Sequence, residues 1–276
     1  CLRSGGGGGS LLRGGGRGDG LGGIGHLGAR RRFLGNCLRH ILILHDHLRQ
    51  AAGFARGIFG GVGLVLGGNI GLSVGEDAVF VIDDQFAPLA PKIKAAIARI
   101  TPKPVQFVMN THFHFDHTGG NEAFGKDGAL IVAHDNVRKR MSTDQLISFI
   151  GAKQNASPKV ALPVITVAGE ATFHINGDEV FAFHVPRAHT DGDLIVHLRK
   201  SDVVHMGDTY FNGMYPFIDG SSGGTAEGVV AAADRVLALS TEKTRIIPGH
   251  GPLASKADLQ AWRDMLATVT QRIKDA

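Results

Sequence analysis

One short segment constrains this chain of 276 residues more than any other part of it. The run His112-Phe113-His114-Phe115-Asp116-His117 gathers three imidazoles and one carboxylate directly after a strand-like apolar run at 105–109. Such side chains are ligands that Zn²⁺ takes in proteins, and they also suit iron or manganese. The alternative is a histidine-rich surface loop, but the preceding strand and the following Gly119-Gly120 favour a metal site.

The spacing within this segment indicates two metal positions. In extended backbone alternate side chains project the same way, so His112, His114 and Asp116 would share a face. His117 breaks the alternation, so its ring must point elsewhere. We therefore expect His112 and His114 to bind one metal ion, and Asp116 and His117 to bind a neighbouring one.

Three further candidate ligands lie downstream. His189, Asp208 and His250 each follow the end of a strand-like run. Glycine or another small residue flanks each of them, which would let the backbone approach a bound ion closely. The sequence thus predicts one metal centre that is assembled from several parts of the chain.

From residue 67 onward, strand-like and helix-like patterns alternate, which is typical of a layered α/β domain. Asn176-Gly177 predicts a type I′ hairpin turn, because these residues accept positive φ. Thr225 is expected to cap one helix, and Ser255 and Asp258 to form a capping box for the last. We predict strands at 69–74, 78–82, 105–109, 130–133, 171–175, 180–185, 194–198, 203–206 and 245–247, and helices at 89–100, from 121, at 226–239 and up to 273.

The ordered set His112-x-His114-x-Asp116-His117, His189, Asp208 and His250 resembles the motifs of the metallo-β-lactamase superfamily. The resemblance covers residues 66–276 and implies a four-layered αβ/βα sandwich, with two mixed β-sheets enclosed by helices. It further implies that one zinc takes His112, His114 and His189. A second zinc would take Asp116, His117 and His250, and Asp208 would bridge the pair. Asp83 resembles the family's aspartate that orients a ligand imidazole.

The same resemblance implies a hydrolase with two Zn²⁺ ions as cofactors. Such a site lowers the pKa of bound water, and Asp116 would orient the nucleophile or pass its proton to the leaving group. Residues 57–276 hold no cysteine, so neither a thiolate nucleophile nor a cysteine ligand is involved. We expect a small-molecule substrate with a cyclic amide or ester, such as a β-lactam or a lactone.

Three alternatives stay open: a thioesterase like glyoxalase II, a phosphodiesterase of the same superfamily, and a metal-binding scaffold without activity. Asp208 weakens a strict β-lactamase assignment, and the extra C-terminal domain of a glyoxalase is not obvious. All seven ligand positions are filled, which favours an enzyme over a scaffold. The residues around the motifs are similar to those of bacterial superfamily members related to β-lactamases.

Residues 1–65 form a Gly/Arg-rich segment that we expect to be disordered or non-native, outside the hydrolase domain of 66–276. Residues 1–56 carry nine Arg and two acids, which leaves 20 basic and 23 acidic residues in 57–276. This mildly acidic balance argues against a nucleic-acid partner. No apolar run is long enough for a membrane span, so we expect a soluble protein. Because both cysteines lie in the N-terminal segment, periplasmic, secreted and cytoplasmic locations stay open, as does the oligomeric state.

Several other polar and aromatic residues near the motifs are further candidates for the site. Tyr210 and Tyr215 are candidates to donate to an oxyanion, and loop packing is the alternative for them. Arg187 is a candidate partner for a substrate carboxylate, although a structural role is favoured. We expect Phe211, Asn212, Met214 and Phe217 to line a pocket, and structural roles for His134, His174, His184, His197 and His205.

Overall fold

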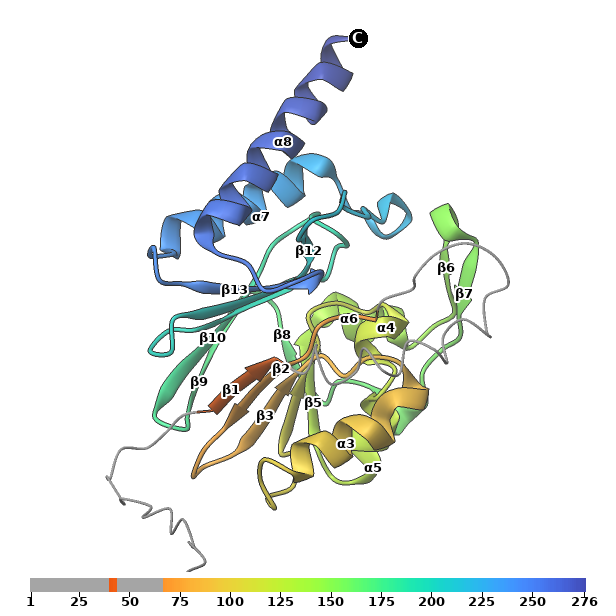
Figure 1. The fold of residues 1–276 in the computed structure, drawn as a ribbon. Helices are drawn as coiled ribbons and strands as arrows, with labels where there is room; N and C mark the ends of the chain where they lie inside the picture. The colour runs from red at the N-terminus through yellow and green to blue at the C-terminus, as the bar shows by residue number, and fades with distance from the viewer. Residues whose placement is uncertain (1–39, 44–66) are drawn as a thin grey trace, which may run out of the picture. The chain divides into compact units, whose positions relative to one another are not determined.

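The computed structural model describes residues 40–43 and 67–276, and two β-sheets form the centre of this part (Figure 1). The first sheet has the strand order β1-β2-β3-β4-β5-β8. Its β1–β2 and β2–β3 pairs are antiparallel and its other pairs are parallel. The strands are β1 (His40–Ile43), β2 (Gly71–Val74), β3 (Val79–Ile82), β4 (Phe107–Met109), β5 (Leu130–His134) and β8 (Ile165–Val167).

The second sheet has the order β13-β12-β11-β10-β9. Only its β12–β13 pair is parallel, so this sheet is mixed as well. Asn176 and Gly177 connect β9 to β10 with φ of 53° and 65°, which confirms the predicted type I′ turn. The strands are β9 (Glu170–Ile175), β10 (Asp178–His184), β11 (Leu194–Leu198), β12 (Val203–Phe211) and β13 (Arg245–His250).

Helices cover the outer face of each sheet (Figure 1). On the first sheet these are α3 (Ala90–Ala98), α5 (Asn121–Lys126) and α6 (Asp135–Met141); on the second they are α7 (Ala226–Leu239) and α8 (Lys256–Asp275). The remaining elements are the single turn α4 (Phe115–Thr118), a small hairpin of β6 (Gln145–Ile147) and β7 (Ala152–Gln154), and the 3₁₀ turns η2 (Ala87–Leu89), η3 (Ser148–Ile150), η4 (Lys159–Ala161) and η5 (Gly220–Ser222).

Separate apolar clusters hold the layers together. In β3, Val79 and Val81 pack towards α3, whereas Phe80 and Ile82 pack between the sheets, because alternate side chains of a strand face opposite ways. A third cluster joins the outer face of the second sheet to α7 and α8. Three buried interfaces between two sheets and two helical layers make the predicted four-layered αβ/βα sandwich.

The predicted elements from 69 onward are confirmed to within a few residues, except that β12 and β13 extend further. The Thr225 side chain accepts from the Gly228 backbone N–H, and Ser255 and Asp258 form the predicted capping box. The elements α4, α6, β6, β7 and β8 were not predicted. In the described residues, no helix has the length and apolar character needed to cross a bilayer.

The structure describes one strand within residues 1–65. β1 lies inside this segment and pairs with β2, from His40 opposite Val74 to Ile43 opposite Gly71. The rest of the segment lies outside the described residues, so the domain boundary at residue 66 stays a prediction.

Candidate metal centre

The histidine-rich segment changes from extended to helical backbone in its middle. His114 still has extended backbone, with φ −60° and ψ 146°, and the turn α4 begins at Phe115. His112 lies in the bend that follows β4 and His114 on extended backbone, whereas Asp116 and His117 are presented from a helical turn. This change in direction explains why His117 does not follow the alternation expected for a strand.

The second sheet supplies the other three residues, and one of them differs from the prediction. His189 lies in the connection between β10 and β11, and His250 is the last residue of β13. Asp208 does not follow its strand but lies within β12, next to an irregularity in the β12–β13 register at Gly207. Gly207 has a φ of 52°, and this kink turns the Asp208 side chain into the site.

The structure brings all seven predicted residues together. His112, His114 and His189 form one group of candidate ligand atoms, and Asp116, His117 and His250 form another; within each group these atoms all lie within 4.8 Å of one another. The atoms His189 Nε2 and His114 Nδ1 are 3.0 Å apart, and His250 Nε2 is 3.2 Å from Asp116 Oδ2.

Asp208 lies between the two groups. Its Oδ1 is 3.0 Å from His117 Nε2, and its Oδ2 is 3.2 Å from His250 Nε2. The same Oδ2 is 3.6 Å from His189 Nε2 and 3.9 Å from His112 Nε2. This is the position that a bridging carboxylate needs, although the assignment of the seven residues as ligands stays a prediction.

Asp83 fixes the ring of His117. Its Oδ2 is 2.8 Å from His117 Nδ1 and accepts from Thr111 Oγ1, while its Oδ1 accepts from the Thr111 backbone N–H. The predicted contact between this aspartate and a ligand imidazole is therefore confirmed. The Nδ1–H of His117 donates to this carboxylate, and its Nε2 faces the site. Burial alone would lower the pKa of His117, but Asp208, Asp116 and Asp83 hold it well above its usual value.

The tautomers of three more imidazoles follow from their partners in the same way. His114 Nε2 is 3.1 Å from Asp219 Oδ2, and His189 Nδ1 is 2.7 Å from the Phe217 carbonyl oxygen. Thr111 Oγ1 gives its proton to Asp83, so at 3.1 Å it accepts from His112 Nδ1. Each of these rings donates outward and turns its other nitrogen, as a lone pair, towards the site.

Such an arrangement fits a bound cation. Lone pairs on His114 Nδ1 and His189 Nε2 would repel each other at 3.0 Å, and a positive ion between them removes that repulsion. His112 Nε2 is buried and has no hydrogen-bond partner, although buried polar atoms nearly always have one. The donor set of imidazoles and carboxylates is one that zinc takes readily.

Electrostatics favour this use for His112 and His189, whereas Asp208 and Asp116 raise the pKa of His250 to about 10 although burial alone would lower it. Burial, and then the neighbouring His117, hold the pKa of His112 well below its usual value, and burial lowers the pKa of His189 to about 4. Both rings are therefore neutral near pH 7, as metal ligands must be. Burial alone would raise the pKa of Asp208, but the imidazoles of His250 and His117 hold it well below its usual value, so this carboxylate is ionised.

Asp219 is the main residue of the site that the sequence analysis missed. Its carboxylate contacts His114, which lies 105 positions earlier in the chain, and accepts from the side chains of Ser221 and Ser222. The Asp219-Gly220-Ser221-Ser222 sequence signals a turn. Nothing local in that signal indicates a contact with a distant histidine.

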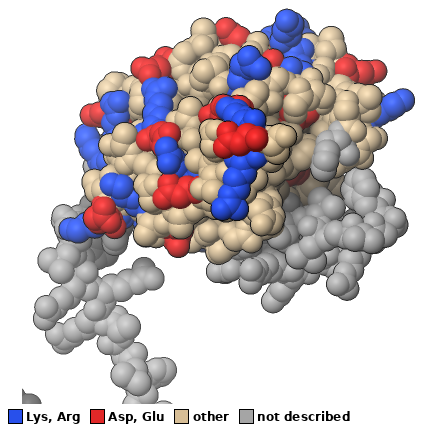
Figure 2. All heavy atoms as spheres, turned by 90° about the horizontal axis from the view of Figure 1, so that it is seen from above, with Lys and Arg blue, Asp and Glu red and all other residues tan. Residues whose placement is uncertain are grey.

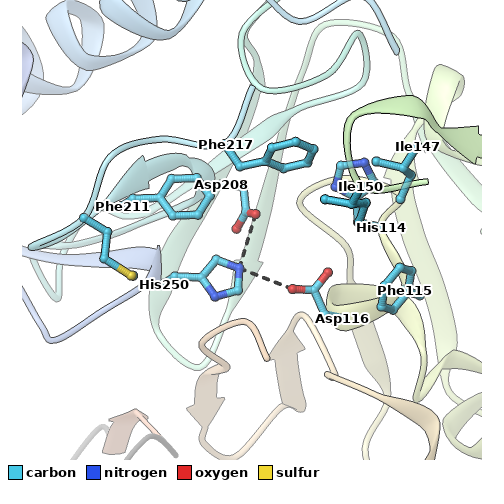
Figure 3. A pocket seen from close by; sticks show the side chains of 10 residues that line it. His114, Phe115, Asp116, Ile147, Ile150, Asp208, Phe211, Phe217 and His250 are labelled. Carbon is cyan, nitrogen blue, oxygen red and sulfur yellow. Dashed lines mark ion pairs between the residues drawn. The ribbon is translucent and has the colours of Figure 1, made fainter. Parts of the chain in front are cut away.

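A pocket opens directly onto the cluster (Figure 3). Four candidate ligands form its floor, and the other lining residues are apolar. The lining consists of His114, Phe115, Asp116, Ile147, Ile150, Asp208, Phe211, Met214, Phe217 and His250.

The aromatic candidates after Asp208 divide between pocket, core and surface. Phe211, Met214 and Phe217 line the pocket as expected, whereas Asn212 does not. The prediction that Tyr210 donates to an oxyanion is wrong, because its side chain is buried in the core against Trp262, with ring centroids 5.0 Å apart.

The polar candidates outside the cluster also lie away from the pocket. Tyr215 is largely exposed, and neither it nor Arg187 lines the pocket. The imidazoles of His134 and His184 stack on each other 3.8 Å apart, and His205 contacts the Asn69 carbonyl oxygen. Among the described residues, the candidate metal groups contain none of the five histidines assigned structural roles.

The sequence pattern of the metallo-beta-lactamase superfamily matches residues 63–250. The chain belongs to this superfamily. Its fold and its cluster of histidines and aspartates are those of a metallo-hydrolase. A solved metallo-beta-lactamase from Pontibacter korlensis is similar in fold, with a TM-score of 0.59 and 18% identity over 72% of this chain and 87% of that one.

Two curated relatives are hydroxyacylglutathione hydrolases. The chain is 27% identical to a hydroxyacylglutathione hydrolase of Polaromonas sp. over 66% of its length, and 27% identical to one of Pelagibacter ubique over 53%. It spans 65% and 52% of the lengths of these two relatives.

Proposed function

We propose that this metallo-hydrolase binds two zinc ions and hydrolyses an ester or lactone bond in an uncharged, apolar small molecule. The observation that supports this proposal is the lining of the pocket. Among the described residues that surround it, none is Lys or Arg, and six are apolar. Among the described lining residues, the charged and titratable side chains all belong to the floor, namely His114, Asp116, Asp208 and His250.

The lining disfavours three anionic substrate classes. Classical β-lactams carry a carboxylate, glutathione thioesters carry two, and phosphodiesters carry a charged phosphoryl group. A site that binds such groups places Arg or Lys near them, because an unpaired charge is costly to desolvate. An ester or lactone with an apolar substituent carries no charged group that would need an Arg or Lys partner.

The residues of the floor have separate tasks in this reaction. His112, His114 and His189 would hold one zinc ion, Asp116, His117 and His250 a second, and Asp208 would touch both. Zinc in such a centre lowers the pKa of a coordinated water towards neutrality and so supplies the nucleophile.

Asp116 is placed to handle the proton. One carboxylate oxygen is 3.2 Å from His250 Nε2, while the side chain also faces the open pocket (Figure 3). It can accept the proton of the attacking water and give it to the departing alkoxide oxygen. The products are a carboxylate and an alcohol, which in a lactone stay on one molecule.

A thioesterase is the second candidate, because the curated relatives named above are hydroxyacylglutathione hydrolases. A panel of substrates on the zinc-loaded protein separates the two. It contains γ- and δ-lactones, a hydroxyacylglutathione thioester, a chromogenic β-lactam and a phosphodiester. We expect chelator-sensitive turnover of lactones with the highest kcat/KM. Preference for the glutathione thioester would replace our proposal with the second candidate.

Two variants test whether the cluster carries the reaction. Loss of a contact around a ligand already costs about 10- to 100-fold in activity or metal affinity, so His112→Ala and Asp208→Ala should each lose at least that much. Activity that survives both substitutions would show that hydrolysis takes place elsewhere.

A further inference from the structure

The apolar residues of the pocket form two opposite sides (Figure 3). On one side Phe115 comes from α4, and Ile147 and Ile150 come from the β6–η3–β7 hairpin. On the other side Phe211 ends β12, and Met214 and Phe217 lie in the segment that follows. A substrate above the floor is therefore flanked by apolar surface from two independent parts of the chain.

The hairpin carries apolar side chains with different environments. Ile147 is buried, whereas Leu146 and Ile150 are each 54% exposed. Of these two exposed residues, only Ile150 lines the pocket. Ile150 therefore presents apolar surface to a ligand in the pocket.

The opposite side repeats this arrangement. Met214 is 38% exposed and lines the pocket, and its neighbour Tyr215 is 81% exposed and does not. The two partly exposed lining residues, Ile150 and Met214, thus come from separate segments of the chain, and each leaves apolar surface accessible in the pocket.

The hairpin is anchored mainly at its base. Gln154 Nε2 donates to the Phe113 carbonyl oxygen at 2.8 Å, and Arg140 Nη1 donates to Gln145 Oε1 at 3.1 Å. At the tip, the Ser148 backbone N–H reaches Ser221 Oγ at 3.4 Å. The hydrogen bonds at the base are thus shorter than the one at the tip. Together they hold the hairpin, and with it Ile150, beside the pocket.

We propose that Ile150 and Met214 determine specificity by holding an unbranched alkyl chain of the substrate between them. This inference rests on the proposed function and narrows its substrate class to esters and lactones with an alkyl substituent. Each methylene that enters the space between the two side chains is removed from water. Full burial of one methylene corresponds to about a fourfold gain in binding, and partial burial to less.

A series of lactones tests this proposal. The zinc-loaded protein is assayed with lactones whose n-alkyl substituent grows from two to eight carbons. We expect kcat/KM to rise about two- to fourfold per methylene in the wild type. In Ile150→Ser and in Met214→Ser this rise should be much smaller than in the wild type.

Matched controls come from the same segments. Leu146→Ser changes a hairpin residue of equal exposure that does not line the pocket, and Tyr215→Ser changes the neighbour of Met214. Both should keep the wild-type dependence on chain length, with the zinc content of all four variants unchanged. A wild-type series without such a rise, or equal effects of Ile150→Ser and Leu146→Ser, would overturn the proposal.

A binding measurement separates this inference from the proposed reaction. n-Alkyl hydroxamates bind zinc through the hydroxamate group, so calorimetry can follow their affinity whatever the natural substrate is. If lactones are not hydrolysed but affinity rises with chain length in the wild type and not in Ile150→Ser, the proposed reaction fails and the alkyl site stands. Affinity that is independent of chain length overturns the alkyl site.

Discussion

The carboxylate of Asp219 lies 3.1 Å from Nε2 of His114 and holds that imidazole with its Nδ1 turned towards His189. Asp219 is buried, and Ser221 and Ser222 each donate a side-chain hydrogen bond to it. Burial would raise the pKa of Asp219, but hydrogen bonds from His114 and the two serines keep it below its usual value. The charged carboxylate therefore fixes both the tautomer and the orientation of a candidate ligand.

Removal of this carboxylate should weaken metal binding. Substitution of a residue that orients a metal ligand costs about 10- to 100-fold in metal affinity or activity, and we expect Asp219→Ala to fall in that range. Asp219→Asn, which keeps one acceptor, should lose less. Zinc affinity is measured by competition with a chromogenic chelator, with Asp264→Asn on exposed α8 as the control. Unchanged affinity in Asp219→Ala would contradict a positioning role.

Asp83 and Asp84 are adjacent in the chain, but we expect substitution of Asp83 to lower the free energy of unfolding more than substitution of Asp84. Asp83 accepts three hydrogen bonds, from Thr111 twice and from His117, so Asp83→Asn should cost about 1–3 kcal/mol per buried donor left unpaired. Burial raises the pKa of Asp84 well above its usual value, although the Gly120 backbone N–H donates to it. Because burial favours the protonated form of Asp84, this position should tolerate Asp84→Asn better. Urea unfolding of the metal-free proteins compares the two, and equal losses would refute the distinction.

Metal removal should lower thermal stability. The cluster places imidazoles and carboxylates within 3.0 to 3.9 Å of one another, and an ion that binds only the folded state stabilises it. At a free zinc concentration of 100 times Kd, this linkage is worth about 2.7 kcal/mol. For a domain of this size we expect a fall in Tm of about 5–10 °C on chelation. Differential scanning fluorimetry with and without chelator gives the value, and His112→Ala should respond far less than the wild type.

Acid should destabilise the protein partly through the His134–His184 stack. Burial, and then the imidazole of His134, lower the pKa of His184 from its ordinary 6.5. The folded state therefore binds this proton less tightly than the unfolded state, so the free energy of unfolding falls as the pH drops below about 6.5. The Nδ1 of His134 accepts a hydrogen bond from the Asn136 backbone N–H at the start of α6, which holds this ring in the stack.

The substitution His184→Gln isolates this contribution. Glutamine can still donate to the Asp191 carbonyl oxygen, which His184 Nε2 contacts at 3.1 Å, but it does not titrate. Unfolding free energies between pH 7.5 and 5.5 should fall less steeply in this variant. His174→Gln, at an exposed position of β9, serves as the control. Parallel pH profiles for wild type and His184→Gln would show that the stack does not contribute.

The sequence predicted most strands and helices because apolar periodicity, Asn176-Gly177 and the Ser255 capping box are local signals, whereas their arrangement in two mixed sheets was implied by the family resemblance. It also located all seven residues of the cluster. What it missed depends on distant contacts. The strands of the β6–β7 hairpin and β8 have three residues each, too few to show a period. Asp219 and the buried position of Tyr210 are likewise set by the packing of segments that are remote in the chain.

The origin of the seven residues has a consequence for folding. His112, His114, Asp116 and His117 follow β4 of the first sheet, whereas His189, Asp208 and His250 belong to the second sheet. A metal ion held by both sets cross-links the two halves of the sandwich, and each half alone would present an incomplete set of donors. Metal occupancy and the docking of the halves would then be a single linked equilibrium, so that a chain divided at the exposed Gly169, between β8 and β9, would reassemble more tightly with zinc than without it.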